Sequence, residues 1–351
     1  MSDTGEKMKI IIDAMGGDNA PGEIVKGAFL ASQKYKSKFV LVGNQAKIEE
    51  EMHKLGADSR IFDIVHTECE ISMEDDPLSV VRSKKDSSMS VGLHMLKEDG
   101  DAFISAGNTG ALHVGSSLIV RPLKGIQRSC IATVLPFGRP MLMLDCGANV
   151  NVTADYLVEW AIMGQIYMKN IFGVKMPTVG LLNNGTEEHK GTQIQIDAYK
   201  KLTDNELVNF IGNIEGKDVP LAKSDVLVTD GFTGNVTLKL IEGMSKFFFG
   251  CLRDMYTKNA LTKMSYTLVK DSLRGIKNDF DPSEYGGSPL LGLKKPVIKA
   301  HGSSDARAVM NAVRQAESFI KTGVIDEIGE KMQNFDRGAK SVPEKTAGKV
   351  N

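Results

Sequence analysis

Short apolar runs alternate with amphipathic stretches along most of the chain. Seven apolar runs predict strands, at residues 8–13, 38–43, 61–65, 101–105, 178–183, 225–229 and 296–300. Apolar residues recur at helical spacing over 22–35, 45–55, 87–99, 108–121, 155–171, 190–201 and 304–321. Strands that alternate with helices favour parallel pairing, with helices on both faces of the sheet. The pattern therefore predicts an α/β fold.

One segment breaks this alternation. Residues 131–147 read "IATVLPFGRPMLMLDCG", which is two apolar runs joined by a Pro-Phe-Gly-Arg-Pro turn. Such a pattern is typical of a β-hairpin, and a hairpin is an antiparallel pair. We therefore expect a mixed, mostly parallel sheet rather than a purely parallel one.

Residues 236–275 form a second exception, because they are too long to be a simple cover for the sheet. Apolar residues recur at helical spacing on either side of a polar break at 257–259, among them Phe248, Leu252, Met255, Met264 and Leu268. This pattern predicts a protruding helical hairpin whose stems bury apolar faces against a partner subunit.

The tip of this hairpin would expose Leu261 and Met264 beside Lys258 and Lys263. Apolar side chains next to lysines suit shallow insertion among anionic lipid head groups. The alternative is that the hairpin serves only as a dimer clamp.

The two ends of the chain are polar and lack apolar periodicity, so residues 1–7 and 334–351 are predicted to be disordered. Between them, residues 8–333 show no repeat and no linker, which favours a single domain. The formal net charge of -1 gives no general attraction to nucleic acid or anionic lipid. No apolar run reaches the roughly 18 residues that span a bilayer.

Four junctions between a predicted strand and the next helix are rich in Gly, Asn, Thr and Ser. They lie at 105–110, 183–191, 230–235 and 301–304. We expect them to share one edge of the sheet, since ligands of open α/β sheets bind outside the carboxyl ends of the strands. Helix N-termini and close-approaching Gly backbone suit a phosphate there. Ser303 or Ser304 is expected to cap the helix that follows.

Familiar catalytic motifs are missing from the sequence. There is no P-loop, no G-x-G-x-x-G after the first strand, no G-x-S-x-G and no H-E-x-x-H. Glu187, Glu188 and His189 could bind a metal, but a solvated loop face explains them better, and we expect no metal or cofactor. Lys190 follows this cluster and precedes Gly191, which puts a cation beside a candidate anion loop.

The four cysteines show no C-x-x-C pair and no zinc spacing, and the N-terminus does not resemble a signal peptide. This combination predicts that the protein is located in the reducing cytoplasm. Cys146 is a candidate nucleophile, but the adjacent Asp145 would disfavour its thiolate. A small buried hydrophobe is the alternative for each cysteine.

A reaction without a general base or triad is possible if the nucleophile needs no deprotonation. Phosphate is already anionic at neutral pH, and a thiolate with a reference pKa of about 8.5 leaves without strong acid help. Attack of phosphate on a thioester would then require positioning and oxyanion stabilisation, which amides and one lysine can supply.

Seven segments, in order, resemble those of the bacterial phosphate acyltransferases of phospholipid synthesis. They are "IDAMGGDNAP" (12–21), "ISAGNTGA" (104–111), "LDCGAN" (144–149), "KG" (190–191), "DGFTGNVTLKLIEG" (230–243), "YGGSPLLGL" (285–293) and "HGSS" (301–304). The resemblance implies transfer of a long-chain acyl group from acyl carrier protein to inorganic phosphate. The acyl phosphate would pass to a membrane glycerol-3-phosphate acyltransferase.

The resemblance also implies a Rossmann-like fold similar to isopropylmalate dehydrogenases and phosphotransacetylases, a homodimer, and peripheral association with the inner face of the cell membrane. It maps the catalytic lysine and asparagine onto Lys190 and Asn235. The phosphate and carrier-arm site would be lined by Gly107, Asn108, Thr109, Gly110, Thr233, Gly234, His301, Ser303 and Ser304.

Three other functions remain open at this point. A phosphotransacetylase acting on acyl-CoA could use the same loops. A dehydrogenase of the related fold is disfavoured, because the paired metal-binding aspartates that it needs are not evident. A scaffold that binds acyl carrier protein without catalysis is the non-enzymatic alternative.

Overall fold

All seven strands predicted from the apolar runs form, and they belong to one eleven-stranded sheet in the computed structural model, which describes residues 7–279 and 285–341. These strands are β1 (Lys9–Asp13), β2 (Lys38–Gly43), β3 (Asp63–His66), β4 (Ala102–Ser105), β7 (Val179–Asn183), β9 (Val226–Val228) and β11 (Val297–Lys299). The sheet order is β3-β2-β1-β4-β11-β10-β5-β6-β9-β7-β8. The predicted α/β class is thereby confirmed.

The predicted hairpin is also present, as the antiparallel strands β5 (Cys130–Phe137) and β6 (Arg139–Leu144). Two further strands, β8 (Phe210–Glu215) and β10 (Ser288–Leu291), were not predicted. β8 is an edge strand that pairs only with β7 and is largely half-exposed, so it lacks a continuous apolar run. β10 is short and contains Pro289, which masks a strand pattern.

The antiparallel strands at the centre reverse the direction of half the sheet. β4 and β11 pair in parallel, and β6, β9, β7 and β8 form a second parallel group. Three consecutive antiparallel pairings separate the two groups: β11 with β10, β10 with β5, and β5 with β6. The strands of the second group therefore run opposite to those of the first. The expectation that all four polar loops share one edge is therefore wrong. Loops 105–110 and 301–304 follow strands of one direction, whereas loops 183–191 and 230–235 follow strands of the other.

The described residues form ten α-helices. They are α1 (Gly22–Lys34), α2 (Gln45–Lys54), α3 (Ser88–Glu98), α4 (Thr109–Gly115), α5 (Ala154–Phe172), α6 (Gln193–Thr203), α7 (Gly231–Thr257), α8 (Ala260–Asp279), α9 (Ala306–Thr322) and α10 (Val324–Ser341). The helix predicted over 108–121 is shorter, because a π-helical turn at Ser116–Val120 follows α4.

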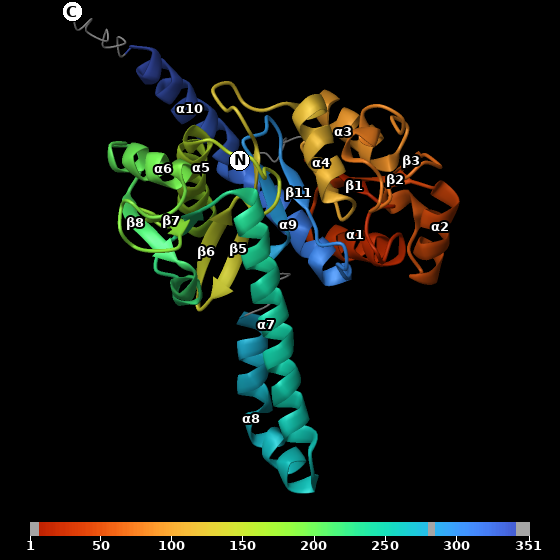
Figure 1. Ribbon diagram of the computed structural model, residues 1–351. Helices are drawn as coiled ribbons and strands as arrows, with labels where there is room; N and C mark the ends of the chain where they lie inside the picture. The colour runs from red at the N-terminus through yellow and green to blue at the C-terminus, as the bar shows by residue number, and fades with distance from the viewer. Residues whose placement is uncertain (1–6, 280–284, 342–351) are drawn as a thin grey trace, which may run out of the picture.

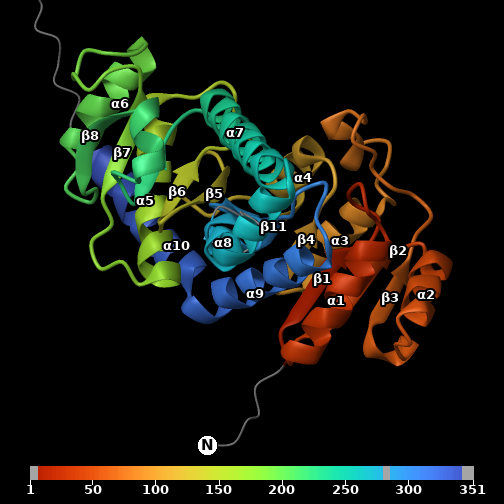
Figure 2. The ribbon, with the colours of Figure 1, turned by 90° about the horizontal axis from the view of Figure 1, so that it is seen from below.

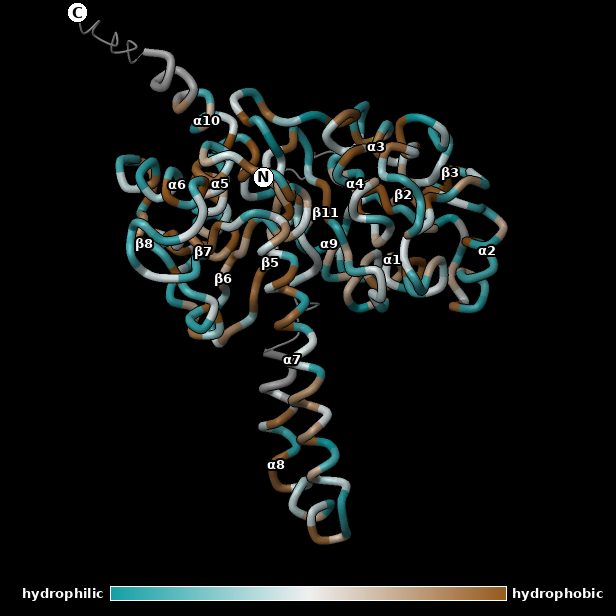
Figure 3. Tube along the Cα trace, viewed as in Figure 1, coloured by the Kyte–Doolittle hydropathy of each residue, from teal (hydrophilic) through white to brown (hydrophobic). Residues whose placement is uncertain are grey.

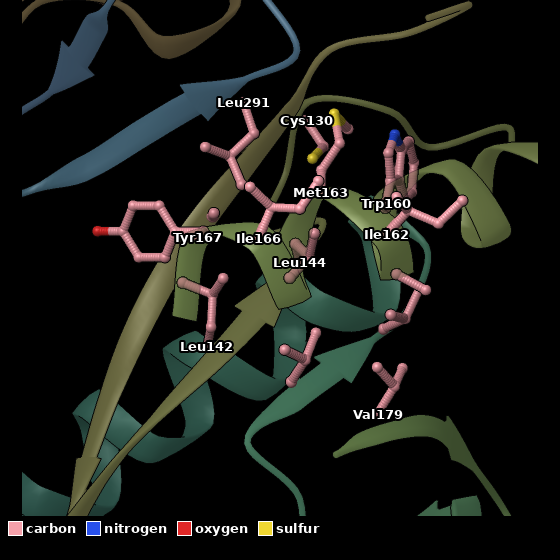
Figure 4. Packing of buried hydrophobic residues seen from close by; sticks show 14 of the residues in the cluster. Cys130, Leu142, Leu144, Trp160, Ile162, Met163, Ile166, Tyr167, Val179 and Leu291 are labelled. Atoms are coloured by element: carbon pink, nitrogen blue, oxygen red, sulfur yellow. The ribbon is translucent and has the colours of Figure 1, made fainter. Parts of the chain in front are cut away.

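The helices cover both faces of the sheet. Side chains of α1, α2 and α9 pack with one face of β1, β2 and β4, and those of α5, α6 and α10 continue this layer over β5, β6, β7 and β9. Figure 2 shows α1 and α9 side by side along this layer. Figure 4 shows its best-filled part, where Trp160, Met163 and Tyr167 of α5 lie beside Leu142 and Leu144 of β6. The opposite face is covered by α3, α4 and the start of α7.

The C-terminal end of the chain differs from its prediction. Residues 334–341 were expected to be disordered, yet they continue α10. Val324, Ile328 and Met332 recur at helical spacing and are buried in the core under α10, and Phe335 packs partly against the same core. This apolar face anchors the helix, and tertiary packing rather than local periodicity carries it past residue 333. Residues 1–6 and 342–351 lie outside the described residues.

The predicted helical hairpin is confirmed and consists of α7 and α8, which project away from the sheet (Figure 1). The turn between them is closed by Asn259, whose side-chain oxygen accepts a hydrogen bond from Thr262 N at 3.0 Å. Figure 3 shows apolar residues along the hairpin and at its tip, far from the core. None of the described helices is long and apolar enough to cross a membrane.

Candidate active site

The N-terminus of α7 is pressed against the loop that follows β6. A Cβ atom added to Gly234 would lie 1.9 Å from Asp145 O, and one added to Gly231 would lie 2.6 Å from Asn149 O. Asp230 caps the helix, because its Oδ1 accepts a hydrogen bond from Thr233 N at 2.8 Å. Only glycine permits backbone contact this close, so these positions fix where α7 starts.

Asp145 holds this loop together from inside the protein. Its Oδ1 accepts hydrogen bonds from Ile131 N at 2.9 Å and Ala148 N at 3.2 Å, and its Oδ2 accepts from Asn149 N at 2.6 Å and Asn149 Nδ2 at 2.9 Å. Burial raises the pKa of the Asp145 carboxyl, and these donors oppose the shift by favouring the carboxylate. Asp145 thus connects β5, the 145–149 loop and the floor under α7.

Asn235 lies in the first turns of α7, above the same loop. Its Nδ2 donates a hydrogen bond to Cys146 O at 3.3 Å, and Gly147 leaves room for the amide, since a Cβ there would lie 2.6 Å from Asn235 Nδ2. Asn235 does not cap α7, because Asp230 is the cap. The side chain is half-buried, so part of it faces solvent.

Lys190 lies in the loop between β7 and α6. Asn183, the last residue of β7, donates a hydrogen bond from Nδ2 to Lys190 O at 3.1 Å, while Lys190 N donates to Glu187 O at 3.1 Å. Gly191 then adopts a positive φ of 90° and leads into the capping box of α6 at Thr192. Lys190 makes no ion pair within residues 7–279 and 285–341, and the residue is half-buried.

Lys190 and Asn235 belong to neighbouring strands of the same direction. β7 pairs in parallel with β9, with Leu181 opposite Val228, so the loops that follow the two strands leave the same edge of the sheet. Lys190 lies in the loop after β7, and Asn235 lies in the first turns of the helix after β9.

A second group of loops meets at the ends of β1, β4 and β11. Asp18 N donates to Gly302 O at 2.8 Å, and Asn19 Nδ2 donates to Ser303 O and Ser304 O at 3.3 Å each. A Cβ on Gly16 would lie 2.8 Å from Gly107 N. Residues 14–19, 105–110 and 301–304 are therefore packed tightly together.

Within this group, Asn108 has its side chain occupied by the protein. Its Oδ1 accepts from Ala111 N at 3.0 Å and caps α4, and its Nδ2 donates to three carbonyl oxygens of the 72–75 loop. Thr109 and Gly110 form the first turn of α4. α9 is capped by Asp305, which accepts from Ala308 N at 2.9 Å, and not by Ser303 or Ser304 as expected. Ser304 Oγ is buried without a hydrogen-bond partner in the described structure.

α7 connects the two groups of loops. Lys239 lies one helical turn after Asn235, and its Nζ is 3.4 Å from His301 Nε2. The other ring nitrogen, Nδ1, lies 2.9 Å from Ser303 Oγ. Burial lowers the pKa of His301, and the charge of Lys239 lowers it further. The candidate site therefore runs along α7, from the ends of β7 and β9 to the 301–304 loop.

Three functional candidates escaped the sequence analysis: Asp13, Ser105 and Lys299. All three are buried; Ser105 Oγ donates to Asp13 Oδ2 at 2.7 Å, and Lys299 Nζ donates to Ala106 O at 3.2 Å and to Ala300 O. Burial lowers the pKa of Lys299 to about 8, although Asp13 and Asp18 oppose the shift. Each residue ends an apolar strand, and a single polar or charged residue at the end of such a run was the only available signal.

Other candidates have a simpler role. Burial raises the pKa of the Cys146 thiol to about 12, and the thiol donates to Met143 O at 3.2 Å, which makes it a poor nucleophile at neutral pH. In the part of the chain that the structure describes, no group of three or more His, Cys, Asp or Glu side chains could hold a metal ion. The described site thus offers amides, hydroxyls, histidine and lysine, the groups that bind anions.

The mixed, mostly parallel α/β architecture is shared with solved structures of phosphotransacylases. A phosphotransacetylase from Streptococcus pyogenes superimposes with a TM-score of 0.59 at 17% sequence identity, covering 90% of this chain and 95% of the other. A branched-chain phosphotransacylase from Enterococcus faecalis V583 gives a TM-score of 0.52 at 16% identity, covering 89% and 98%. At these identities, the likeness concerns the fold alone.

Sequence comparison identifies the family. The model of a family described as "Fatty acid synthesis protein" matches residues 8–327. A phosphate acyltransferase of Thermoanaerobacter pseudethanolicus is 43% identical over 331 residues, covering 93% of this chain and 98% of the relative. One of Bacillus licheniformis is 44% identical over 330 residues, covering 93% and 98%. The chain belongs to the phosphate acyltransferase family.

The close approach of α7 to Asp145 yields a prediction with a matched pair of variants. Gly234→Ala should move the first turn of α7 and lower activity at least tenfold, because its Cβ has no room beside Asp145 O. Gly243→Ala, in the same helix with open space around it, should raise the free energy of unfolding by about 0.5–1 kcal/mol and leave activity intact. Chemical denaturation measures the free energy of unfolding of both variants, and steady-state kinetics measure their activity. Equal activity of the two variants would contradict the role given to Gly234.

Proposed function

We propose that this protein transfers an acyl group reversibly from acyl carrier protein to inorganic phosphate, forming the acyl phosphate used in phospholipid synthesis. The observation that carries the proposal is the unpaired Lys190, at the sheet edge where Asn235 enters α7, in a member of the phosphate acyltransferase family. A cation and an amide beside a helix N-terminus suit a reaction between phosphate and a carbonyl group.

The proposed reaction requires no base from the protein. A phosphate oxygen attacks the thioester carbonyl carbon, a C–O bond forms, and the carbonyl oxygen takes up negative charge. Collapse of this intermediate breaks the C–S bond and releases the carrier thiolate, which takes a proton from solvent. Lys190 neutralises the phosphate or the developing oxyanion, and Asn235 donates a hydrogen bond to the same centre.

The surrounding loops would position the two substrates. In this proposal the site that binds phosphate and the carrier arm is lined by Gly107, Asn108, Thr109, Gly110, Thr233, Gly234, His301, Ser303 and Ser304. Backbone N–H groups carry more of this role than Asn108, whose side chain already caps α4 and binds the 72–75 loop. The contact between Lys239 and His301 supports a continuous site, since it joins α7 to the 301–304 loop.

A second candidate function is acyl transfer from acyl-CoA to phosphate, as in a phosphotransacetylase. It is favoured by the fold shared with the Streptococcus pyogenes phosphotransacetylase. Rates measured side by side with acyl carrier protein and acyl-CoA of the same chain length separate the two. Phosphate-dependent release of the carrier thiol would exclude a non-enzymatic scaffold.

We further propose that the enzyme works as a cytoplasmic homodimer at the inner face of the membrane, where it delivers acyl phosphate to a glycerol-3-phosphate acyltransferase. Support comes from the hairpin, which exposes large apolar side chains on both helices. On α7 these are Phe232, Val236, Leu240, Met244, Phe247 and Phe248. Exposed apolar stripes of this extent mark contact surfaces for a subunit or a membrane.

Lys190→Met tests the proposed cation. The substitution keeps the length of the side chain but removes its charge, so turnover should fall by about 100-fold or more, the scale of losing one oxyanion donor. The thermal midpoint should stay unchanged, since Lys190 makes no ion pair in the described residues. Lys200→Met, at an exposed lysine of α6, is the control and should retain full activity. Normal turnover of Lys190→Met would rule out the assignment.

Asn235→Ala tests the proposed hydrogen-bond donor. If the amide contacts the reacting centre, kcat should fall by more than KM for phosphate rises, because the interaction strengthens in the transition state. Stability should barely change, whereas Asp230→Ala, which removes the cap, should cost about 1 kcal/mol of unfolding free energy. Steady-state kinetics measure the loss of turnover in Asn235→Ala, and thermal unfolding measures the loss of stability in Asp230→Ala. A destabilised Asn235→Ala variant with intact turnover would assign Asn235 a structural role.

A double variant tests the membrane role of the hairpin tip. Leu261 and Met264 are 71% and 64% exposed, and replacing both with Glu removes apolar area and adds repulsion from anionic lipid. Co-sedimentation with anionic vesicles should drop severalfold, while dimer mass and activity without lipid persist. The control is Met176→Glu with Leu221→Glu, which adds the same charge on the body at similarly exposed positions. If the tip variant sediments like the parent, the hairpin is a dimer clamp only.

A further inference from the structure

The first half of α7 carries a polar stripe that starts at the proposed reacting centre. Asn235, Lys239, Glu242 and Lys246 follow one another at intervals of four, three and four residues, so they lie on one side of the helix. Leu238 and Ile241 face the core, and the exposed apolar residues lie on the remaining side. The polar stripe is therefore distinct both from the packed face and from the face suited to a partner subunit.

This stripe faces the 301–304 loop. Lys239 Nζ lies 3.4 Å from His301 Nε2 and 2.8 Å from Glu242 Oε2. The pKa of His301 is lowered by burial first, then by the charge of Lys239, and also by those of Lys299 and Lys246, with Glu242 opposing. Of these three lysines, Lys239 is the one in direct contact with the His301 ring.

Lys246 is the cation of this stripe whose charge is not committed elsewhere. Lys239 pairs with Glu242, and Lys299 is buried against backbone carbonyls. Lys246 is exposed and forms no ion pair with any residue that the structure describes. An exposed cation without an ion-pair partner in the described residues suits an anionic ligand.

The length of the stripe matches a carrier arm. Eleven residues separate Asn235 from Lys246, which places their backbones about 16 Å apart along the helix. The phosphopantetheine arm of a carrier protein has roughly thirteen bonds between its thioester sulfur and its phosphorus, or about 15 Å when extended like a peptide backbone. A thioester at Asn235 would therefore bring the phosphodiester of the arm to Lys246.

We propose that Lys246 binds the phosphodiester of the carrier arm, while the neutral amides of the arm run along Lys239 and Glu242. This inference rests on the proposed function, because it takes Asn235 as the site of the thioester. Lys246 is a binding residue, since it lies too far from the reacting carbonyl to take part in the chemistry. It distinguishes donors that carry a phosphorylated arm from those that do not.

The test uses two soluble donors that differ only in the phosphate, acyl-phosphopantetheine and acyl-pantetheine, with inorganic phosphate as acceptor. The wild-type enzyme should prefer the phosphorylated donor about tenfold in kcat/KM, as expected for one charge-assisted hydrogen bond in a half-exposed site. Lys246→Gln should reduce this preference to about twofold or less, through KM rather than kcat, and should leave the rate with acyl-pantetheine unchanged.

Two controls keep the result specific. Lys246→Arg retains the charge and should retain most of the preference. Lys258→Gln makes the same charge change about 18 Å further along the hairpin and should behave as wild type. Thermal midpoints of all variants should agree, since Lys246 and Lys258 are exposed.

The outcomes separate this inference from the function on which it rests. If the wild type turns over neither donor, nor acyl carrier protein itself, the proposed function fails. If it turns over both donors without a preference, or if Lys246→Gln keeps the wild-type preference, only the arm site is overturned. A loss of preference confined to Lys246→Gln supports it.

Discussion

The contact between the first turn of α7 and the loop after β6 determines most of what this molecule presents to its substrates. Gly231 and Gly234 bring helix backbone against Asp145 and Asn149 with no room for a Cβ atom. Asp145, held by four N–H donors, makes the loop a rigid base. The start and direction of α7 follow from this base, and with them the position of Asn235, the contact of Lys239 with His301 and the projection of the hairpin.

The reversal of strand direction at the centre of the sheet explains why such a connecting helix is needed. In a sheet with a single direction, all the loops after the strands would meet at one edge. Here the insertion of β10 and the β5-β6 hairpin gives opposite directions to the strands that lead into the two groups of loops. α7 begins with one group and passes the other, so one helix carries side chains toward both. A substrate with a reactive end and a distant phosphate suits a site of this elongated form.

The charged residues around the candidate site fall into two kinds, those that are buried and hydrogen-bonded and those without an ion-pair partner in the described chain. Asp13, Asp145 and Lys299 are buried and hydrogen-bonded, so they hold loops in place. Lys190 and Lys246 lack ion-pair partners in the described chain and differ in position, one at the sheet edge and one along α7. Because an unpaired lysine gives up little when an anion arrives, we propose these two positions for the inorganic phosphate and for the phosphodiester of the carrier arm.

The sequence by itself determined the strands with continuous apolar runs, the β5-β6 hairpin, the helical hairpin and the family, because burial and turn chemistry leave local patterns. It also singled out Lys190 and Asn235 through short motifs. It did not reveal β8 or the extension of α10, whose apolar faces are completed only by neighbours such as β7 and the core under Phe335. Nor could it show which edge each loop occupies, since strand direction depends on pairings between segments far apart in the chain. The Asp13–Ser105 hydrogen bond, the burial of Lys299 and the meeting of Lys239 with His301 were decided by tertiary structure alone, because each joins residues or loops that only the folded sheet brings within contact distance.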